Sequence, residues 1–169
     1  PGAPRDALVG IDMEIAARAT VGLVGGSGAG KTTAVDLILG LLPPREGVIA
    51  VDGVTIDAAN RRAWRRSIGI ARALYHDPDV LIMDEATSAL DNLTERAVMD
   101  AVRNLGRSKT IILIAHRLST VRDCDVIFLF DRGRVAAQGS YDALLAANEL
   151  FRAMAAHPAD DGPGAASPG

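Results

Sequence analysis

Uninterrupted apolar runs, rather than alternating ones, stand out along this chain of 169 residues. Runs of this kind are typical of strands that are buried on both faces of a parallel sheet. Polar or turn-forming residues close each run, and stretches with helical character lie between them. The pattern predicts buried strands at Thr20–Val24, Val80–Met83, Thr110–Ala115 and Asp125–Phe130. Strands that alternate with helices predict an α/β fold with a mostly parallel sheet flanked by helices.

Shorter elements are predicted between and after these strands. Asp52-Gly53 is a hairpin signal that joins Val48–Val51 to Val54–Ile56 in a small antiparallel pair. Asn92, with Glu95 three positions further on, resembles a capping arrangement. The remaining predictions are helices at Lys31–Leu41, Arg61–Ser67, Asn92–Leu105 and Tyr141–Ala156, a strand at Arg134–Ala137 after a turn at Arg132-Gly133, and a disordered tail over residues 157–169.

The composition of the chain argues against several classes of protein. A hydrophobic share of 49% and a charged share of 23% are typical of one folded domain. The net charge of −3 gives no long-range attraction to nucleic acid or to an anionic membrane. Cys124 is the single cysteine, so a disulfide within the chain is excluded, and the three histidines lack metal-ligand spacing. No apolar run approaches the ~20 residues that span a bilayer, so we expect a domain on the cytosolic side.

A glycine-rich loop follows the first predicted strand. It matches the pattern Gly-x-x-x-x-Gly-Lys-Thr between a strand and a helix, which is the phosphate-binding P-loop. The loop can point successive backbone N–H groups into one anion-sized hollow, and the next helix adds the positive end of its dipole. Lys31 can reach the β- and γ-phosphates, and the hydroxyl of Thr32 can bind Mg²⁺. The candidate nucleotide-binding residues are Gly25, Gly26, Ser27, Gly28, Ala29, Gly30, Lys31, Thr32 and Thr33.

Polar side chains also follow two later strands. Asp84 and Glu85 end one buried strand, and His116 ends another. The carboxyl ends of parallel strands face the ligand crevice, so all three can approach the P-loop. Asp84 can accept a water bound to Mg²⁺, and Glu85 can orient the attacking water. His116 can hold the γ-phosphate through a hydrogen bond.

The segment Arg61–Arg66 combines four arginines with Trp64. One interpretation is a nucleic-acid or anionic-lipid patch in which the aromatic ring stacks. The other is a solvated helix face. The acidic overall composition favours the solvated face, so no nucleic-acid partner is predicted.

The sequence around these residues resembles that of one protein family. Leu81–Asp91 resembles the Walker B motif and D-loop of ABC-type ATPases, and Ile112–Thr120 resembles their switch-histidine segment. Together with the P-loop, which corresponds to Walker A, the order is highly specific. The likeness runs from about Ala7 to Ala156 and favours the exporter branch, with lipid or oligosaccharide flippase-like members preferred.

This resemblance implies a complete set of roles. Lys31, Glu85 and His116 would be the catalytic residues, with Glu85 as the base and His116 as the γ-phosphate switch. Thr32 and Asp84 would bind Mg²⁺. Ser88–Asp91 would face a second copy, with Asp91 at the nucleotide, in a head-to-tail dimer that holds two ATP molecules. The implied partners are a second nucleotide-binding domain and the transmembrane domains of an exporter, which place the chain at the cytoplasmic face of the membrane.

The sequence departs from the family between the hairpin and Walker B. The family carries a glutamine loop, a helical subdomain and a Leu-Ser-Gly-Gly-Gln signature in this interval. Here the single glutamine is Gln138, and the single Gly-Gly pair is Gly25-Gly26. All three features are therefore missing from the sequence, and Ile68-Gly69 is the expected seam. We predict an ABC-type ATP-binding core over residues 1–156, internally shortened near residues 68–70.

The shortening leaves three function hypotheses. The first is ATP binding and hydrolysis that power export or flipping by an ABC transporter. The second is a nucleotide-binding fragment with little or no turnover, because the signature and glutamine loop are absent. The third is a soluble ABC-type ATPase, which lacks support because no basic surface or coiled-coil insert is present. Loss of the strand at the seam is expected to expose Val80–Met83, which would favour aggregation.

Overall fold

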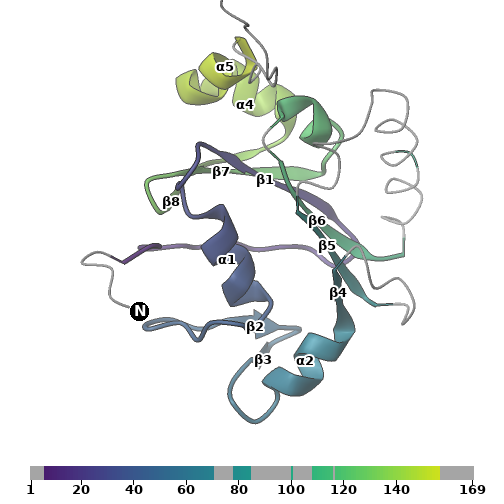
Figure 1. The fold of residues 1–169 in the computed structure, drawn as a ribbon. Helices are drawn as coiled ribbons and strands as arrows, with labels where there is room; N and C mark the ends of the chain where they lie inside the picture. Colours follow the sequence, from purple (N-terminus) through teal and green to yellow (C-terminus); the bar gives the residue numbers. More distant parts are fainter. Residues whose placement is uncertain (1–5, 71–77, 85–99, 101–107, 116, 157–169) are drawn as a thin grey trace, which may run out of the picture.

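The structure is a computed structural model that describes residues 6–70, 78–84, 100, 108–115 and 117–156. Its main element is a six-stranded sheet with the order β4-β5-β6-β1-β7-β8 (Figure 1). Neighbouring strands from β4 to β7 are parallel, and β8 is antiparallel to β7. The strands are β1 (Thr20–Gly25), β4 (Ile68–Ile70), β5 (Val80–Asp84), β6 (Thr110–Ile114), β7 (Val126–Asp131) and β8 (Arg134–Gly139). This is the predicted α/β fold with a mostly parallel sheet.

The predicted antiparallel pair forms a separate small sheet. It consists of β2 (Ala50–Val51) and β3 (Val54–Thr55), with Ala50 opposite Thr55. One further backbone bond, from Ile56 N–H to the Ile49 carbonyl at 2.8 Å, extends the pairing beyond the strands. The Asp52-Gly53 turn is therefore confirmed as the hairpin connection.

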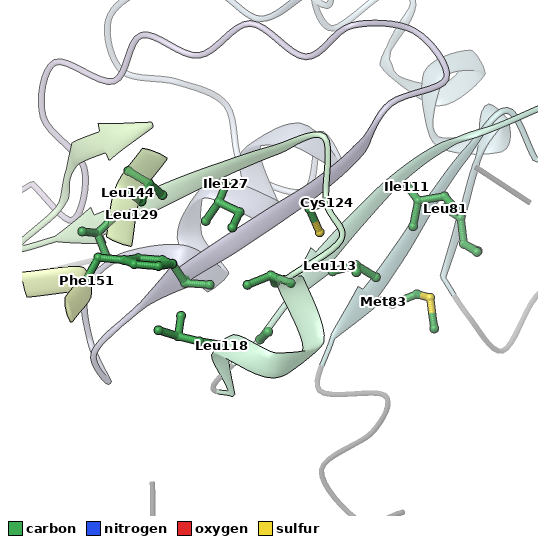
Figure 2. Packing of buried hydrophobic residues seen from close by; sticks show 13 residues of the cluster. Leu81, Met83, Ile111, Leu113, Leu118, Cys124, Ile127, Leu129, Leu144 and Phe151 are labelled. Carbon is green, nitrogen blue, oxygen red and sulfur yellow. The ribbon is translucent and has the colours of Figure 1, made fainter. Parts of the chain in front are cut away.

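Alternate residues of each central strand bury opposite faces of the main sheet. Ile112 and Phe128 belong to the face covered by α1 (Lys31–Ile38). Leu113 and Leu129 belong to the other face. That second face is covered by a 3-10 turn, η2 (Leu118–Val121), and by the helices α4 (Tyr141–Ala147) and α5 (Glu149–Ala156), which place Leu144 and Phe151 among its members (Figures 1 and 2). Burial on both faces explains why the strands read as continuous apolar runs.

Cys124 lies in the second face, beside the end of η2 (Figure 2). Burial, with the nearby charges of Asp125 and Asp123, raises the pKa of its thiol from 9.0 to about 12. The thiol is thus neutral in the folded protein at ordinary pH. Because the pKa is raised on folding, its contribution to stability is complete below pH 9 and is lost as the pH rises toward 12.

We expect iodoacetamide to alkylate Cys124 at least roughly tenfold more slowly in the folded chain than in urea at pH 8, because only the exposed thiolate reacts. Mass spectrometry at timed intervals measures both rates. Cys124 is the single cysteine, so each modified chain reports on this site alone. Equal rates under the two conditions would contradict its buried position.

The seam segment forms the edge strand of the sheet. β4 pairs in parallel with β5, with Ile68 opposite Val80 and Ile70 opposite Ile82. The expectation that Val80–Met83 would be exposed is therefore wrong: Leu81, Ile82 and Met83 are 3%, 2% and 7% exposed. The reason is that the residues at the junction are themselves apolar and extended, so they occupy the place beside β5.

The helix predicted at Lys31–Leu41 ends earlier, at Ile38. Gly40 adopts a left-handed φ of 66°, which stops the helix. Its N–H donates to the Leu37 carbonyl at 2.9 Å, and the N–H of Leu41 donates to the Asp36 carbonyl at 2.8 Å. These two bonds form a Schellman motif, a terminator that the apolar run Leu37–Leu42 concealed in the sequence.

The predicted helix α2 (Arg61–Ser67) docks against this helix end. Trp64 Nε1 donates to the Ile38 carbonyl at 2.6 Å, and the Arg65 guanidinium donates to the Gly40 carbonyl. A cation at a helix C-terminus also complements the dipole. Trp64 and Arg65 thus contribute to the fold, and the solvated helix face stays a prediction for the segment.

Replacing Trp64 with Phe tests this docking. The variant keeps most of the packing but leaves the Ile38 carbonyl without the indole donor, so we expect a loss of about 1 kcal/mol in the free energy of unfolding. Urea unfolding followed by circular dichroism measures it. Arg66→Ala, an exposed change on the same helix, is the control and should shift stability by less than about 0.5 kcal/mol. Equal stabilities of Trp64→Phe and Arg66→Ala would contradict the role of the indole.

The predicted helix Tyr141–Ala156 is divided into α4 and α5. Asn148 is extended at the junction, with φ −117° and ψ 119°. Its side-chain oxygen accepts the N–H of Phe151 at 2.9 Å and so caps the second helix. Ser140 caps the first by accepting the N–H of Ala143. The tail 157–169 and all of the predicted helix Asn92–Leu105 except Asp100 lie outside the described residues.

Candidate nucleotide-binding site

The P-loop lies between β1 and α1, as predicted. β1 ends at Gly25, and α1 begins at Lys31 after the N-cap residue Gly30. Gly25 and Ala29 are buried, whereas Gly26, Ser27 and Gly28 are exposed. The first turn of α1 contains no acidic residue, so nothing on the helix itself neutralises the positive end of its dipole. The loop therefore presents an exposed rim in front of a helix N-terminus.

Lys31 is the one buried charged side chain among the described residues, with 5% exposure. Its ammonium group donates to the carbonyl of Gly25 at 2.7 Å and to that of Gly26 at 3.1 Å. In a trans peptide the carbonyl and the following N–H point in opposite directions. Holding these two carbonyls thus turns the N–H groups of Gly26 and Ser27 away from the ammonium group.

The space on the outer side of the rim is open. A Cβ atom placed on Gly26 or on Gly28 would meet no other atom within 4 Å. By contrast, a Cβ on Gly25 would lie 2.2 Å from the Phe130 carbonyl oxygen. The loop is therefore tight against the sheet on its inner side and open on its outer side, where N–H groups and the Lys31 charge can meet an anion.

Asp84 lies at the carboxyl end of the parallel strands, as the P-loop does. It is the last residue of β5 and pairs with Ile114 of β6, whose own neighbour in β1 is Leu23. Asp84 is exposed, and β6 separates it from the P-loop strand. The strand Thr110–Ile114 thus lies between the P-loop strand and the Asp84 strand. The hydroxyl-bearing Thr32 is exposed and Thr33 is half-buried at the start of α1.

The remaining predicted site residues are not placed by the structure. Glu85, His116, Asp91 and the segment Ser88–Asp91 lie outside the described residues. Glu85 is the residue that directly follows Asp84, and His116 follows Ala115, whose N–H donates to the Leu23 carbonyl at 3.1 Å. Their roles stay predictions.

One contact to the P-loop was missed in the sequence. The N–H of Gly133, in the turn between β7 and β8, donates to the carbonyl of Ala29 at 2.9 Å. Arg132-Gly133 reads only as a hairpin turn in the sequence, because a backbone contact between distant segments leaves no side-chain signal. The turn is thus part of the loop's immediate surroundings.

The sheet order and this loop define an α/β domain of the P-loop nucleotide-binding class. A family model described as ABC transporter matches residues 8–70. The match includes the whole P-loop and ends at the last residue of β4. Nucleotide binding is the property that this family implies.

Curated relatives and a solved structure agree with the family. An ATP-dependent lipid A-core flippase of Cupriavidus pinatubonensis is 32% identical, covering 89% of this chain and 38% of that protein. A Beta-(1→2)glucan export ATP-binding/permease protein NdvA of Rhizobium etli is 31% identical, covering 87% and 37%. A bacterial Atm1-family ABC exporter with ATP bound superposes with a TM-score of 0.86 at 29% identity, covering 95% of this chain and 40% of that chain. The chain belongs to the ABC transporter family, as a partial ABC domain with exporter-type relatives.

The relatives also carry residues that this chain lacks. The alignment with the flippase extends over 222 residues, more than the 169 of the entire chain. An alignment longer than the chain requires positions in the relative that have no counterpart in this chain. The internal shortening near residues 68–70 stays a prediction. The chain spans only about 38% of the length of that relative. Within the described part of the chain, no helix is both long and apolar enough to cross a membrane.

Proposed function

We propose that this chain binds ATP through Gly25–Thr33. The observation that carries the proposal is the geometry of the loop: the buried Lys31 ammonium lies behind an exposed glycine rim at a helix N-terminus without acidic residues. Phosphate oxygens on the rim would receive N–H donors from the loop and charge from Lys31. The structural relative, an Atm1-family exporter, has ATP bound, and this supports the choice of ligand.

Mg²⁺ and the water-activating residues complete the proposed site. Thr32 and Asp84 would hold the ion, which suits oxygen ligands such as a hydroxyl and a carboxylate, and the ion would offset charge on the phosphates. Glu85 would orient and deprotonate the attacking water, and His116 would hold the γ-phosphate. Support comes from the position of Asp84 at the carboxyl end of the parallel strands, where the P-loop also lies, and from the family membership.

The wider role follows from the relatives. We place the chain in an ABC exporter, as the ATP-binding part that lies at the cytoplasmic face and drives its transmembrane domains. A second nucleotide-binding domain would pair with it head-to-tail, with Ser88–Asp91 at the contact. The relatives' names, a lipid A-core flippase and a glucan export protein, support export or flipping as the process.

A second candidate is ATP binding with little or no turnover. It is favoured by one observation, that relatives align over more residues than this chain contains. In the family the missing interval includes the signature that completes the γ-phosphate site of the partner copy. Without those groups, developing charge on the phosphate would be less well stabilised.

Calorimetric titration of the purified chain with ATP, with and without Mg²⁺, tests the proposal. We expect saturable binding that Mg²⁺ strengthens, because Thr32 and Asp84 would gain a shared cation. Adenosine, which lacks the phosphates, should bind far more weakly. Equal binding of adenosine and ATP would overturn a phosphate-directed site, and absence of ATP binding would overturn the proposed function.

A further inference from the structure

Two hairpin turns in the described part of the chain have the same backbone conformation. Asp52-Gly53 joins β2 to β3 with φ values of 50° and 78°, and Arg132-Gly133 joins β7 to β8 with φ values of 47° and 77°. Two positive φ values in succession are typical of a type I′ turn. The surroundings of the two turns differ: a Cβ on Gly53 would meet nothing within 4 Å, whereas Gly133 is buried.

In the second turn, both the N–H and the carbonyl of Gly133 form hydrogen bonds to other segments. Its N–H donates to the carbonyl of Ala29 in the P-loop at 2.9 Å. Its carbonyl accepts the N–H of Val9 from the N-terminal segment, also at 2.9 Å. A Cβ on Gly133 would lie 2.5 Å from the carbonyl oxygen of Ala7, which is too close for any side chain. The turn is thus enclosed between the P-loop and residues 7–9.

The bond to Ala29 fixes a peptide unit that matters for phosphate binding. Because carbonyl and N–H point in opposite directions across a trans peptide, holding the Ala29 carbonyl toward the turn directs the Gly30 N–H away from it. Gly30 is the N-cap of α1, where unpaired N–H groups bind anions. Lys31 restrains the Gly25 and Gly26 carbonyls at the other end of the loop.

We infer that Gly133 is a positioning residue for nucleotide binding: the turn between β7 and β8 braces the P-loop so that its last N–H groups face the phosphates. The inference rests on the proposed function, because it assigns a second support to the same site. Gly133 does not contact the nucleotide and acts through Ala29 and Gly30. The P-loop is then held from behind at two places, by a side chain within the loop and by a backbone group about a hundred positions further along the chain.

The two turns provide a matched pair of variants. Gly133→Ala introduces a residue at positive φ and a Cβ against Ala7, which displaces the N–H that holds Ala29. Gly53→Ala introduces the same positive-φ strain in a turn that does not touch the P-loop. We expect both to lower the melting temperature, and only Gly133→Ala to raise the Kd for ATP, by about tenfold, as expected for the loss of one hydrogen bond. The Kd of Gly53→Ala for ATP should stay within about twofold of the Kd of the unmodified chain.

Titration calorimetry at a temperature at which circular dichroism shows both variants folded separates the outcomes. Equal Kd values for the two variants, with ATP binding intact in the unmodified chain, would overturn the brace and leave the proposed function standing. Absence of ATP binding in the unmodified chain would overturn both. If Gly133→Ala does not fold, hydrogen exchange of the Gly133 amide in the unmodified chain decides instead, because its N–H makes the bond to Ala29. Since coupling between two sites is reciprocal, saturating ATP should slow the exchange of the Gly133 amide by at least about tenfold and leave that of the Gly53 amide unchanged. Exchange of the Gly133 amide that ATP does not slow would then overturn the brace.

Discussion

Lys31→Ala is expected to weaken ATP binding by at least roughly a hundredfold, which corresponds to the loss of about 3 kcal/mol of charge-assisted hydrogen bonding. Lys31 is buried, with 5% of the residue exposed, and burial strengthens the interaction of a charged group with an anion. Alanine also releases the Gly25 and Gly26 carbonyls, which Lys31 holds at 2.7 and 3.1 Å. Titration with ATP measures the change directly.

Lys109 provides the matched control. It is the other of the two lysines in the chain, and its ammonium group also donates to a backbone carbonyl, that of Pro78, at 2.7 Å. It precedes β6 and so lies at the opposite end of the sheet from the P-loop. Lys109→Ala should leave the Kd for ATP unchanged. An unchanged affinity in Lys31→Ala would show that the P-loop assignment itself is wrong.

Glu85→Gln is expected to lower ATP turnover by roughly 10²- to 10⁴-fold while leaving ATP binding in place. The change removes the basic oxygen that would accept a proton from the attacking water but keeps the size of the side chain. Phosphate release from the purified chain with Mg²⁺ and ATP measures the rate, and Lys31→Ala gives the background. The prediction follows from the family pattern and from the position of Glu85 directly after Asp84.

Asp79→Asn is the control for Glu85→Gln. It makes the same carboxylate-to-amide change at the amino end of β5, immediately before Val80. Turnover in this variant should equal that of the original chain. Equal, near-zero rates for the original chain and for Glu85→Gln would exclude a working ATPase in this chain alone. ATP binding would then remain, and the second candidate function would hold.

The central strands could be predicted because burial on both faces leaves a direct signal. Ile111–Ile114 and Ile127–Phe130 are buried throughout, and their apolar runs end where the strands end to within one or two residues. The Asp52-Gly53 hairpin was predictable for a different reason, since type I′ turns restrict which residues fit. Such local signals do not depend on distant partners.

Tertiary contacts decided the elements that the sequence did not reveal. β4 is a three-residue strand that is held by its pairing with β5. The segment Ile68–Ile70 is too short to show a strand periodicity in the sequence. The end of α1 was hidden because Leu39, Leu41 and Leu42 continue an apolar run past Gly40. Asn148 divided one predicted helix into two by offering its side chain to Phe151 in place of a helical backbone bond.

The site was predicted only as far as side-chain chemistry allows. Lys31 and the glycines around it have a spacing that few other loops share, and the structure places them between β1 and α1 as expected, while their binding roles stay predictions. Contacts made by backbone groups were invisible, as with the Gly133 N–H and the carbonyl of Ala29. The position of Asp84 could be predicted because the carboxyl ends of parallel strands lie at the same end of the sheet.

The position of β1 in the middle of the sheet has a consequence for the order of events during synthesis. β1 is synthesised long before its two neighbours, β6 and β7, which begin only at Thr110 and Val126. The bond from Thr20 N–H to the Asp125 carboxylate joins residues 105 positions apart. At ~5–20 residues per second, the apolar strand waits several seconds for both partners. We therefore expect the nascent chain to be prone to aggregation until Asp131 has been synthesised, because Val21–Val24 lack one or both strand partners before then.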